Sequence, residues 1–347
     1  MHGYFSKFAL LCLMILLMLL LTVDPLQLLV AQVPTPVVKE LSFQTGEQGK
    51  NAIQPDSIYS SWKLQSFSAK NYLIGVFFSD STTGTIVGGG GIIVRSTDSG
   101  KTWFAQSSGT TKDLYYVFFS DTKTGTTVGT DGTILRTING GVNWISQKSD
   151  VVNHLLGVSF VSTMKGIVVG TRGIILQTID GGVHWVKQSS GTTNNLKAAC
   201  FRNAHLCTVV GLNGTILQSK DAGVTWKSQK SNTINNLFAV SFSDVNTGTA
   251  VGFGGTILRT TNGGKTWSTQ SSGTTKHLNG VSFCDARIGT AVGGDGTIIR
   301  TTDGGTTWVT QVNKSSQYLY GVSFKNPNIG IAVGNIGIIL RTTSGGW

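Results

Sequence analysis

The chain has 347 residues, with 46 glycines and 5 prolines, and no Gly-X-Y period accompanies the glycine, so a collagen-like fibre is excluded. Basic residues outnumber acidic residues 27 to 16, which gives a formal charge of +11. This charge favours an anionic partner such as an acidic protein segment, a lipid headgroup or a polyanion, but a merely soluble basic surface is an equally good interpretation.

The N-terminus carries an apolar run over residues 8–23, which resumes at 26–31 after Asp24 and Pro25. A first run of about 16 residues is short for a membrane-spanning helix and typical of a signal peptide. We therefore expect 1–31 to be a signal peptide or an N-terminal membrane anchor, followed by a linker over 32–57. Both alternatives place the remaining chain outside the cytoplasm, in a periplasm, a lumen or the extracellular space, which disfavours nucleic acid as a partner.

The eight tryptophans mark an internal repeat. Six successive intervals are 41 residues long and the last is 39, with tryptophan at 62, 103, 144, 185, 226, 267, 308 and 347. Searching for such a period comes first because it decides the fold class.

Each repeat contains four short segments rich in β-branched residues. The first three are illustrated by LLGVSF (155–160), GIVVG (166–170) and GTILRT (132–137), and the fourth has the form W-x-x-Q. Four strands per 41 residues, occurring seven times, predict an all-β, seven-bladed β-propeller of four-stranded blades over 58–347. The chain begins with a lone W-x-x-Q strand at Trp62 and ends at Trp347 without one, so we expect the N-terminal strand to complete the last blade and close the ring.

The turn before each tryptophan reads S/T-x-D/N-x-G-x-x-W, as in STDSGKTW (96–103) and TIDGGVHW (178–185). The short polar side chains accept backbone N–H bonds inside the turn, and glycine takes the left-handed conformation. The motif is identified as the Asp-box, or bacterial neuraminidase repeat. It indicates a propeller, whereas its turn residues are structural.

The longer pattern VG-x-x-G-T-I-L-R-T-x-D-G-G-x-T-W, repeated over 58–347, resembles the repeat of photosystem II stability and assembly factors. Those factors are exported seven-bladed propellers without enzymatic activity. The resemblance implies a monomer that binds a protein partner, an acidic segment of a membrane complex, and assists assembly of that complex. Membrane association through the N-terminus would fit this role.

Arginine recurs at one position of the third strand in five repeats: Arg95, Arg136, Arg259, Arg300 and Arg341. Gln177 and Gln218 take its place in the other two. Because the family displays a basic patch for an acidic partner, the resemblance implies that this arginine ring binds the partner. The alternative is structural, with each arginine stacked on a neighbouring tryptophan or bonded to turn carbonyls.

A second candidate surface is formed by the turns between the second and third strands, which we expect on the face opposite the Asp-boxes. Their residues vary between repeats, and loops on a rigid scaffold often carry specificity. This variable-loop face includes Asp131, Arg172, Leu212, Phe253 and Asn335.

An enzyme site is disfavoured. The only glutamates of the chain, Glu40 and Glu47, precede the repeats, while a sialidase or another glycosidase needs carboxylates within the propeller. We therefore expect no catalytic residue, no cofactor and no metal site. The alternative function is an extracellular carbohydrate- or surface-binding propeller related to sialidases and other glycoside hydrolases. A disulfide between Cys200 and Cys207 is allowed but not required.

Overall fold

The computed structural model describes residues 61–65, 67 and 70–347, which belong to a compact unit spanning Ile58–Trp347. The expected signal peptide or anchor and the linker lie outside the described residues. Within the described ranges, no helix is long and apolar enough to cross a membrane.

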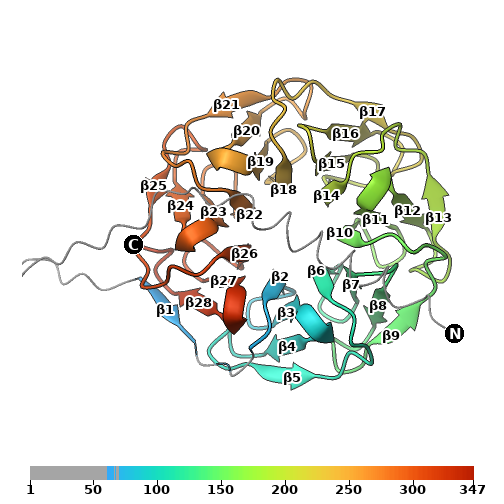
Figure 1. The fold of residues 1–347 in the computed structure, drawn as a ribbon, viewed down its shortest axis with the longest axis horizontal. Helices are drawn as coiled ribbons and strands as arrows, with labels where there is room; N and C mark the ends of the chain where they lie inside the picture. Colours follow the sequence, from blue (N-terminus) through green and yellow to red (C-terminus); the bar gives the residue numbers. More distant parts are fainter. Residues whose placement is uncertain (1–60, 66, 68–69) are drawn as a thin grey trace, which may run out of the picture. The chain divides into compact units, whose positions relative to one another are not determined.

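In the described part of the chain, 28 strands form seven four-stranded antiparallel sheets arranged as the blades of a propeller (Figure 1). Blades 1 and 2 consist of β2 (Leu73–Phe78), β3 (Gly84–Gly88), β4 (Ile93–Ser96), β5 (Phe104–Gln106), β6 (Leu114–Phe119), β7 (Gly125–Gly129), β8 (Ile134–Thr137) and β9 (Ile145–Gln147). Blades 3 and 4 consist of β10 (Leu155–Phe160), β11 (Gly166–Gly170), β12 (Ile175–Thr178), β13 (Val186–Gln188), β14 (Leu196–Phe201), β15 (Cys207–Gly211), β16 (Ile216–Ser219) and β17 (Lys227–Ser228).

Blades 5 and 6 consist of β18 (Leu237–Phe242), β19 (Gly248–Gly252), β20 (Ile257–Thr260), β21 (Ser268–Gln270), β22 (Leu278–Phe283), β23 (Gly289–Gly293), β24 (Ile298–Thr301) and β25 (Val309–Thr310). Blade 7 consists of β26 (Leu319–Phe324), β27 (Gly330–Gly334), β28 (Ile339–Thr342) and β1 (Trp62–Leu64). Short 3-10 turns follow the second strand of five blades: η1 (Gly89–Gly91), η2 (Thr171–Gly173), η3 (Phe253–Gly255), η4 (Gly294–Gly296) and η5 (Asn335–Gly337). The sequence prediction of an all-β, seven-bladed propeller is confirmed.

The N-terminal strand closes the ring, as expected. β1 pairs antiparallel with β28, with Trp62 opposite Thr342 and Leu64 opposite Leu340, and Figure 1 shows the blue β1 beside the red β28. The Trp62 side chain is only 2% exposed and meets the Phe324 ring edge-on at a centroid distance of 5.8 Å. Trp347 is 59% exposed. Trp62 therefore supplies the buried tryptophan of blade 7, and the terminal tryptophan does not compete for that place.

The phenylalanine that ends the innermost strand lies flat on the glycine that begins the second strand. In blade 3, a Cβ added to Gly166 would lie 2.5 Å from the Phe160 ring, which no side chain can approach so closely. The Phe160 ring also meets the Trp185 ring edge-on at 6.0 Å, a favourable aromatic geometry. The repeated Gly, Phe and Trp thus form one packing unit of the blade.

Blade 4 departs from this unit because Cys207 stands where the other blades have glycine. Strand pairing sets Cys207 opposite Phe201 and Cys200 opposite Thr208. Neighbouring residues of a strand point to opposite faces, so the two cysteines join different hydrophobic clusters on either side of the sheet. Both thiols are free, and the geometry does not permit the disulfide that the sequence left open.

We predict that Trp62→Ala lowers the free energy of unfolding by about 3–5 kcal/mol, because it leaves a cavity in blade 7 and loosens the closing strand. The matched control is Trp347→Ala, whose exposed ring should cost no more than about 0.5 kcal/mol. Urea unfolding of both variants measures the difference. Equal losses would contradict closure through Trp62.

Candidate functional site

The Asp-box turns use their polar side chains internally. In the box of blade 1, the Gly100 N–H donates to Ser96 Oγ at 2.8 Å, and the Thr102 N–H and hydroxyl donate to the Asp98 carboxylate at 3.0 and 2.6 Å. Burial alone would raise the pKa of Asp98, but the hydrogen bonds from Thr102 and Ser96 outweigh it and lower the pKa to about 2. This carboxylate is therefore a fixed acceptor of the turn and is poorly suited to carry protons in catalysis.

Three arginines of the predicted ring are buried between blades. The Arg136 guanidinium donates to Thr126 Oγ1 at 2.9 Å and to the Thr163 carbonyl of the next blade, and its Cζ lies 5.0 Å from the centre of the Phe160 ring. Arg259 and Arg300 make the equivalent contacts with blades 6 and 7, over Phe283 and Phe324 at 4.8 and 5.0 Å. Their exposed fractions are 8, 7 and 3% for Arg136, Arg259 and Arg300.

The two remaining arginines are half-buried. Arg341 donates from Nε to the Ser99 carbonyl of blade 1 at 2.8 Å. Arg95 lies beside the Asp-box of blade 2, where its guanidinium would meet a Cβ added to Gly140 at 3.3 Å. Each arginine thus reaches toward a loop of the following blade.

Blades 3 and 4 have glutamine at this position. In blade 4, a cation is supplied instead by Arg202, from a different strand. Gln177 and Gln218 donate to the carbonyls of Ala222 and Gly263 in the next blade, at 2.7 and 2.6 Å. Arg202, at the end of the innermost strand, stacks over Phe242 at 4.9 Å and donates to the Val245 carbonyl at 2.8 Å. Its guanidinium contacts the same ring and carbonyl positions as those of Arg136 and Arg259.

Lys325 occupies the Arg202-equivalent position of blade 7, three blades further along the ring. Its ammonium donates to the Ser81 carbonyl of blade 1 and to Ser99 Oγ. A cation bonded to the loop after the innermost strand thus recurs at five blade junctions, supplied by two different sequence positions. This recurrence indicates a structural role.

The guanidinium groups at 136, 259 and 300 are buried and hydrogen-bonded within the protein, which does not favour an exposed arginine patch. Bonding to turn carbonyls, one form of the structural alternative, is confirmed. Stacking on tryptophan is not, since the aromatic partners are phenylalanines of the next blade. That the arginine ring contacts a partner stays a prediction.

The variable-loop residues lie on the face opposite the Asp-boxes. The turns between second and third strands bond to the loops that enter each blade, as the Thr171 N–H does to the His154 carbonyl at 2.9 Å. The Asp-boxes bond instead to the loops after the innermost strands, as Gly181 does to Met164 at 2.9 Å. The two sets of loops therefore occupy separate faces.

The side chains of the variable-loop face differ in how far they are exposed and in whether they bond to other residues of the chain. Asp131 is held by Lys112 at 2.5 Å, and Asn335 accepts a hydrogen bond from the Tyr320 hydroxyl at 2.8 Å. Phe253 is 45% exposed and lies against His277, with ring centres 4.2 Å apart. Leu212 is half-buried, and Arg172 is exposed on a residue with φ of 56°. Arg172 and Phe253 are the members most available to a partner, and their contact with one stays a prediction.

The sequence interpretation missed a set of exposed apolar side chains on the outer edge of blades 2 and 3. This apolar rim comprises two Asp-box residues and one outer-strand residue from each blade, together with Met164: Ile138, Val142, Ile145, Met164, Ile179, Val183 and Val186, which are 50–69% exposed. The equivalent box positions are Thr97 and Lys101 in blade 1 and Thr302 and Thr306 in blade 6. The motifs TINGGVNW and TIDGGVHW, compared with TTDGGTTW, already carried this signal.

The sequence matches the family described as photosynthesis system II assembly factor YCF48 over residues 50–138, 138–228 and 260–347. None of the curated proteins is similar in sequence. In the described residues, no group of three or more histidine, cysteine or acidic side chains could hold a metal ion.

Solved structures share the fold at low sequence identity. YCF48 from Cyanidioschyzon merolae is 21% identical, with a TM-score of 0.68 over 81% of this chain and 98% of that one. A structure described as YCF48 bound to D1 peptide is 19% identical, with a TM-score of 0.70 over 84% and 97%. The GH74 enzyme of Niastella koreensis is 13% identical, with a TM-score of 0.66 over 81% of this chain and 53% of the enzyme, so the fold is also found in enzymes.

We predict that the double variant Arg136→Gln, Arg300→Gln loses about 1–3 kcal/mol of unfolding free energy at each site, through lost charge-assisted hydrogen bonds and cation–π contact. Arg172→Gln, on an exposed turn, is the control and should be nearly neutral. Urea denaturation gives both values. An undiminished stability, together with weakened partner binding, would restore the exposed-patch interpretation.

The Asp-box carboxylates should make stability fall in acid. The pKa values of Asp98, Asp180 and Asp303 are lowered to about 2, below the unfolded value of about 3.9, so their stabilisation is complete above that value and is lost as pH falls through the folded pKa. For Asp180, the first cause is the hydrogen bond from the His184 N–H.

Asp180→Asn keeps an acceptor, as Asn139 and Asn262 do in blades 2 and 5. We therefore expect the variant to show a shallower decline of melting temperature than the wild type between about pH 4 and pH 2. Asp150→Asn, outside the Asp-boxes, serves as the comparison. Parallel acid profiles for Asp180→Asn and the wild type would contradict the assignment.

Proposed function

Because the chain belongs to the photosynthesis system II assembly factor YCF48 family, we propose that it binds a protein segment and assists the assembly of a membrane complex. The sequence prediction of this family is confirmed by the match to it. A related propeller is described as bound to a D1 peptide, which supports a peptide segment as the kind of partner. The formal charge of +11 favours an acidic segment.

The apolar rim is the surface that we propose for this contact. The observation that carries the proposal is the departure of its Asp-box residues from the repeat, since the outer-strand position is also apolar and exposed in blades 1 and 6, at Phe104 and Val309. The Asp-box backbone is the same in every complete box, so threonine and lysine serve the fold at positions where blades 2 and 3 expose isoleucine and valine. Exposed apolar side chains gathered on neighbouring elements are typical of protein interaction sites. Scaffold packing gives no reason for these residues.

The apolar rim also offers a cationic setting for an acidic segment. Lys123, Lys165 and Lys187 are exposed on blades 2 and 3, next to the apolar positions in sequence or in the adjoining loops. Apolar contacts would supply most of the affinity, and the lysines would add salt-dependent attraction.

A non-enzymatic role remains part of the proposal. The Asp-box aspartates are committed to turns, as Asp98 and Asp180 show, and both glutamates of the chain precede the blades. The GH74 likeness concerns the fold alone at 13% identity. Export of the propeller and a monomeric state are also proposed, and they rest on the sequence.

We predict that Ile179→Thr, Val183→Thr weakens binding of a D1 peptide by about tenfold or more, because it removes apolar contact area at the rim. These threonines reproduce Thr302 and Thr306 of blade 6, so the fold should tolerate them. Fluorescence anisotropy with a labelled peptide measures the affinity, and thermal melting checks the fold.

The comparison variant Arg172→Ala, Phe253→Ala tests the variable-loop face in the same assay. Loss of binding in this variant alone would move the contact to that face and overturn the apolar rim as the site. Absence of binding by the wild type would contradict a D1-like partner.

A further inference from the structure

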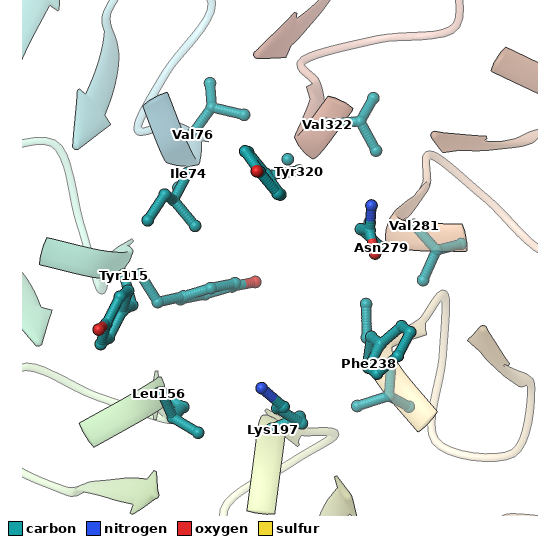
Figure 2. Close-up of a pocket in the computed structure, with 16 residues that line it drawn as sticks. Ile74, Val76, Tyr115, Leu156, Lys197, Phe238, Asn279, Val281, Tyr320 and Val322 are labelled. Atoms are coloured by element: carbon teal, nitrogen blue, oxygen red, sulfur yellow. The ribbon is translucent and has the colours of Figure 1, made fainter. Parts of the chain in front are cut away.

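The innermost strands of the seven blades surround a cavity of about 400 Å³ (Figure 2). This volume lies within the range of small-molecule pockets. The second residue of each innermost strand faces the cavity, and the seven blades differ most sharply there. Ile74, Leu156 and Phe238 make the wall apolar.

Polar groups on this wall are few, and most are engaged within the protein. Asn279 Nδ2 donates to the Leu319 carbonyl at 2.8 Å, and the Tyr320 hydroxyl donates to Asn335 Oδ1 at 2.8 Å. Lys197, on β14, is the only cation of the cavity wall, and Figure 2 shows its nitrogen directed toward the middle of the cavity.

The Lys197 ammonium has no counter-ion among the described residues. The cavity wall contains no aspartate or glutamate, and none of the ion pairs of the described chain involves this lysine. Lys197 is half-buried, and this burial lowers its pKa because no opposite charge compensates for the lost hydration.

The fold itself does not need a cation at this position. Leu156 in blade 3 and Phe238 in blade 5, on either side of Lys197, stand at the equivalent place in their strands. The lysine therefore imposes an electrostatic cost that an apolar residue would avoid, and a ligand carrying the opposite charge would offset this cost.

We propose that the central cavity binds a small organic anion: a carboxylate joined to an apolar or aromatic group. The carboxylate would pair with the Lys197 ammonium, and the apolar group would lie against Phe238 and its aliphatic neighbours. A single cation on a largely apolar wall fits a monoanion, whereas a phosphate prefers several donors. This site is separate from the apolar rim and does not depend on the proposed function.

The same carboxylate chemistry could come from a free acid or from the C-terminus of a peptide. The experiment therefore titrates the full chain by calorimetry with 4-phenylbutyrate, with its neutral amide, and with a short peptide ending in phenylalanine whose terminus is free or amidated. We expect the free carboxylates to bind and the amides to bind at least tenfold more weakly. Binding of phenylbutyrate without the peptide would identify a free acid as the ligand, and tighter binding of the peptide would identify a chain terminus.

Lys197→Leu is the decisive variant, because it copies Leu156 and should leave the melting temperature unchanged or raise it. Lys227→Leu, at an exposed site on the outer strand of the same blade, is the matched control. We expect carboxylate affinity to fall at least tenfold in the first variant and to stay unchanged in the second. Equal affinity in both variants, or no saturable binding of any carboxylate by the wild type, would overturn the proposal.

A pH series supplies a second test. Carboxylate binding should weaken as pH rises through the lowered pKa of Lys197, since the neutral amine no longer attracts an anion. The other titratable groups on the cavity wall are Tyr115, Tyr116 and Tyr320, whose pKa values are raised by burial, so they stay neutral over the same range. Affinity independent of pH would contradict pairing with Lys197.

Discussion

The contact between neighbouring blades is the constraint on which the rest of the structure depends. A four-stranded blade can bury its faces only against the next blade, so every junction must repeat a similar fit. At most junctions three groups contact one phenylalanine ring: a glycine of the same blade, the tryptophan of the same blade and a cation from the preceding blade. In blade 3 the ring is that of Phe160, which contacts Trp185 and Arg136. Ring closure applies the same rule between the two ends of the propeller, with Trp62 on Phe324.

Blade 4 shows that the parts of this fit can be replaced. Cysteine replaces the glycine, glutamine replaces the arginine, and yet Arg202 brings a guanidinium over Phe242 from another strand. Four junctions share a guanidinium over the phenylalanine ring of the next blade, whereas the junction of blades 3 and 4 has the Gln177 amide bonded to a loop carbonyl instead. The residue number that supplies the cation is secondary, as Lys325 also illustrates at the junction of blades 7 and 1.

Positions outside the repeated contact between blades differ in sequence from one repeat to the next. The two candidate binding sites lie at such positions. The outer Asp-box positions differ between threonine, lysine, isoleucine and valine without a change of backbone, which allows blades 2 and 3 to expose the apolar rim. The second residue of each innermost strand differs in the same way around the cavity, and one blade places Lys197 there. The apolar rim belongs to two neighbouring blades and the lysine to one, within an otherwise regular scaffold.

The sequence by itself determined the number of blades, their four strands, the closing strand and the family, because a 41-residue period and a displaced W-x-x-Q segment leave one way to bury the strands. Burial and direction of side chains were decided by the tertiary structure. The repeat pattern set the arginines at equal positions, but only the packing of one blade on the next shows Arg300 buried on Phe324. Likewise, Cys200 and Cys207 flank one turn in sequence, and strand register alone sends their side chains to opposite faces of the sheet.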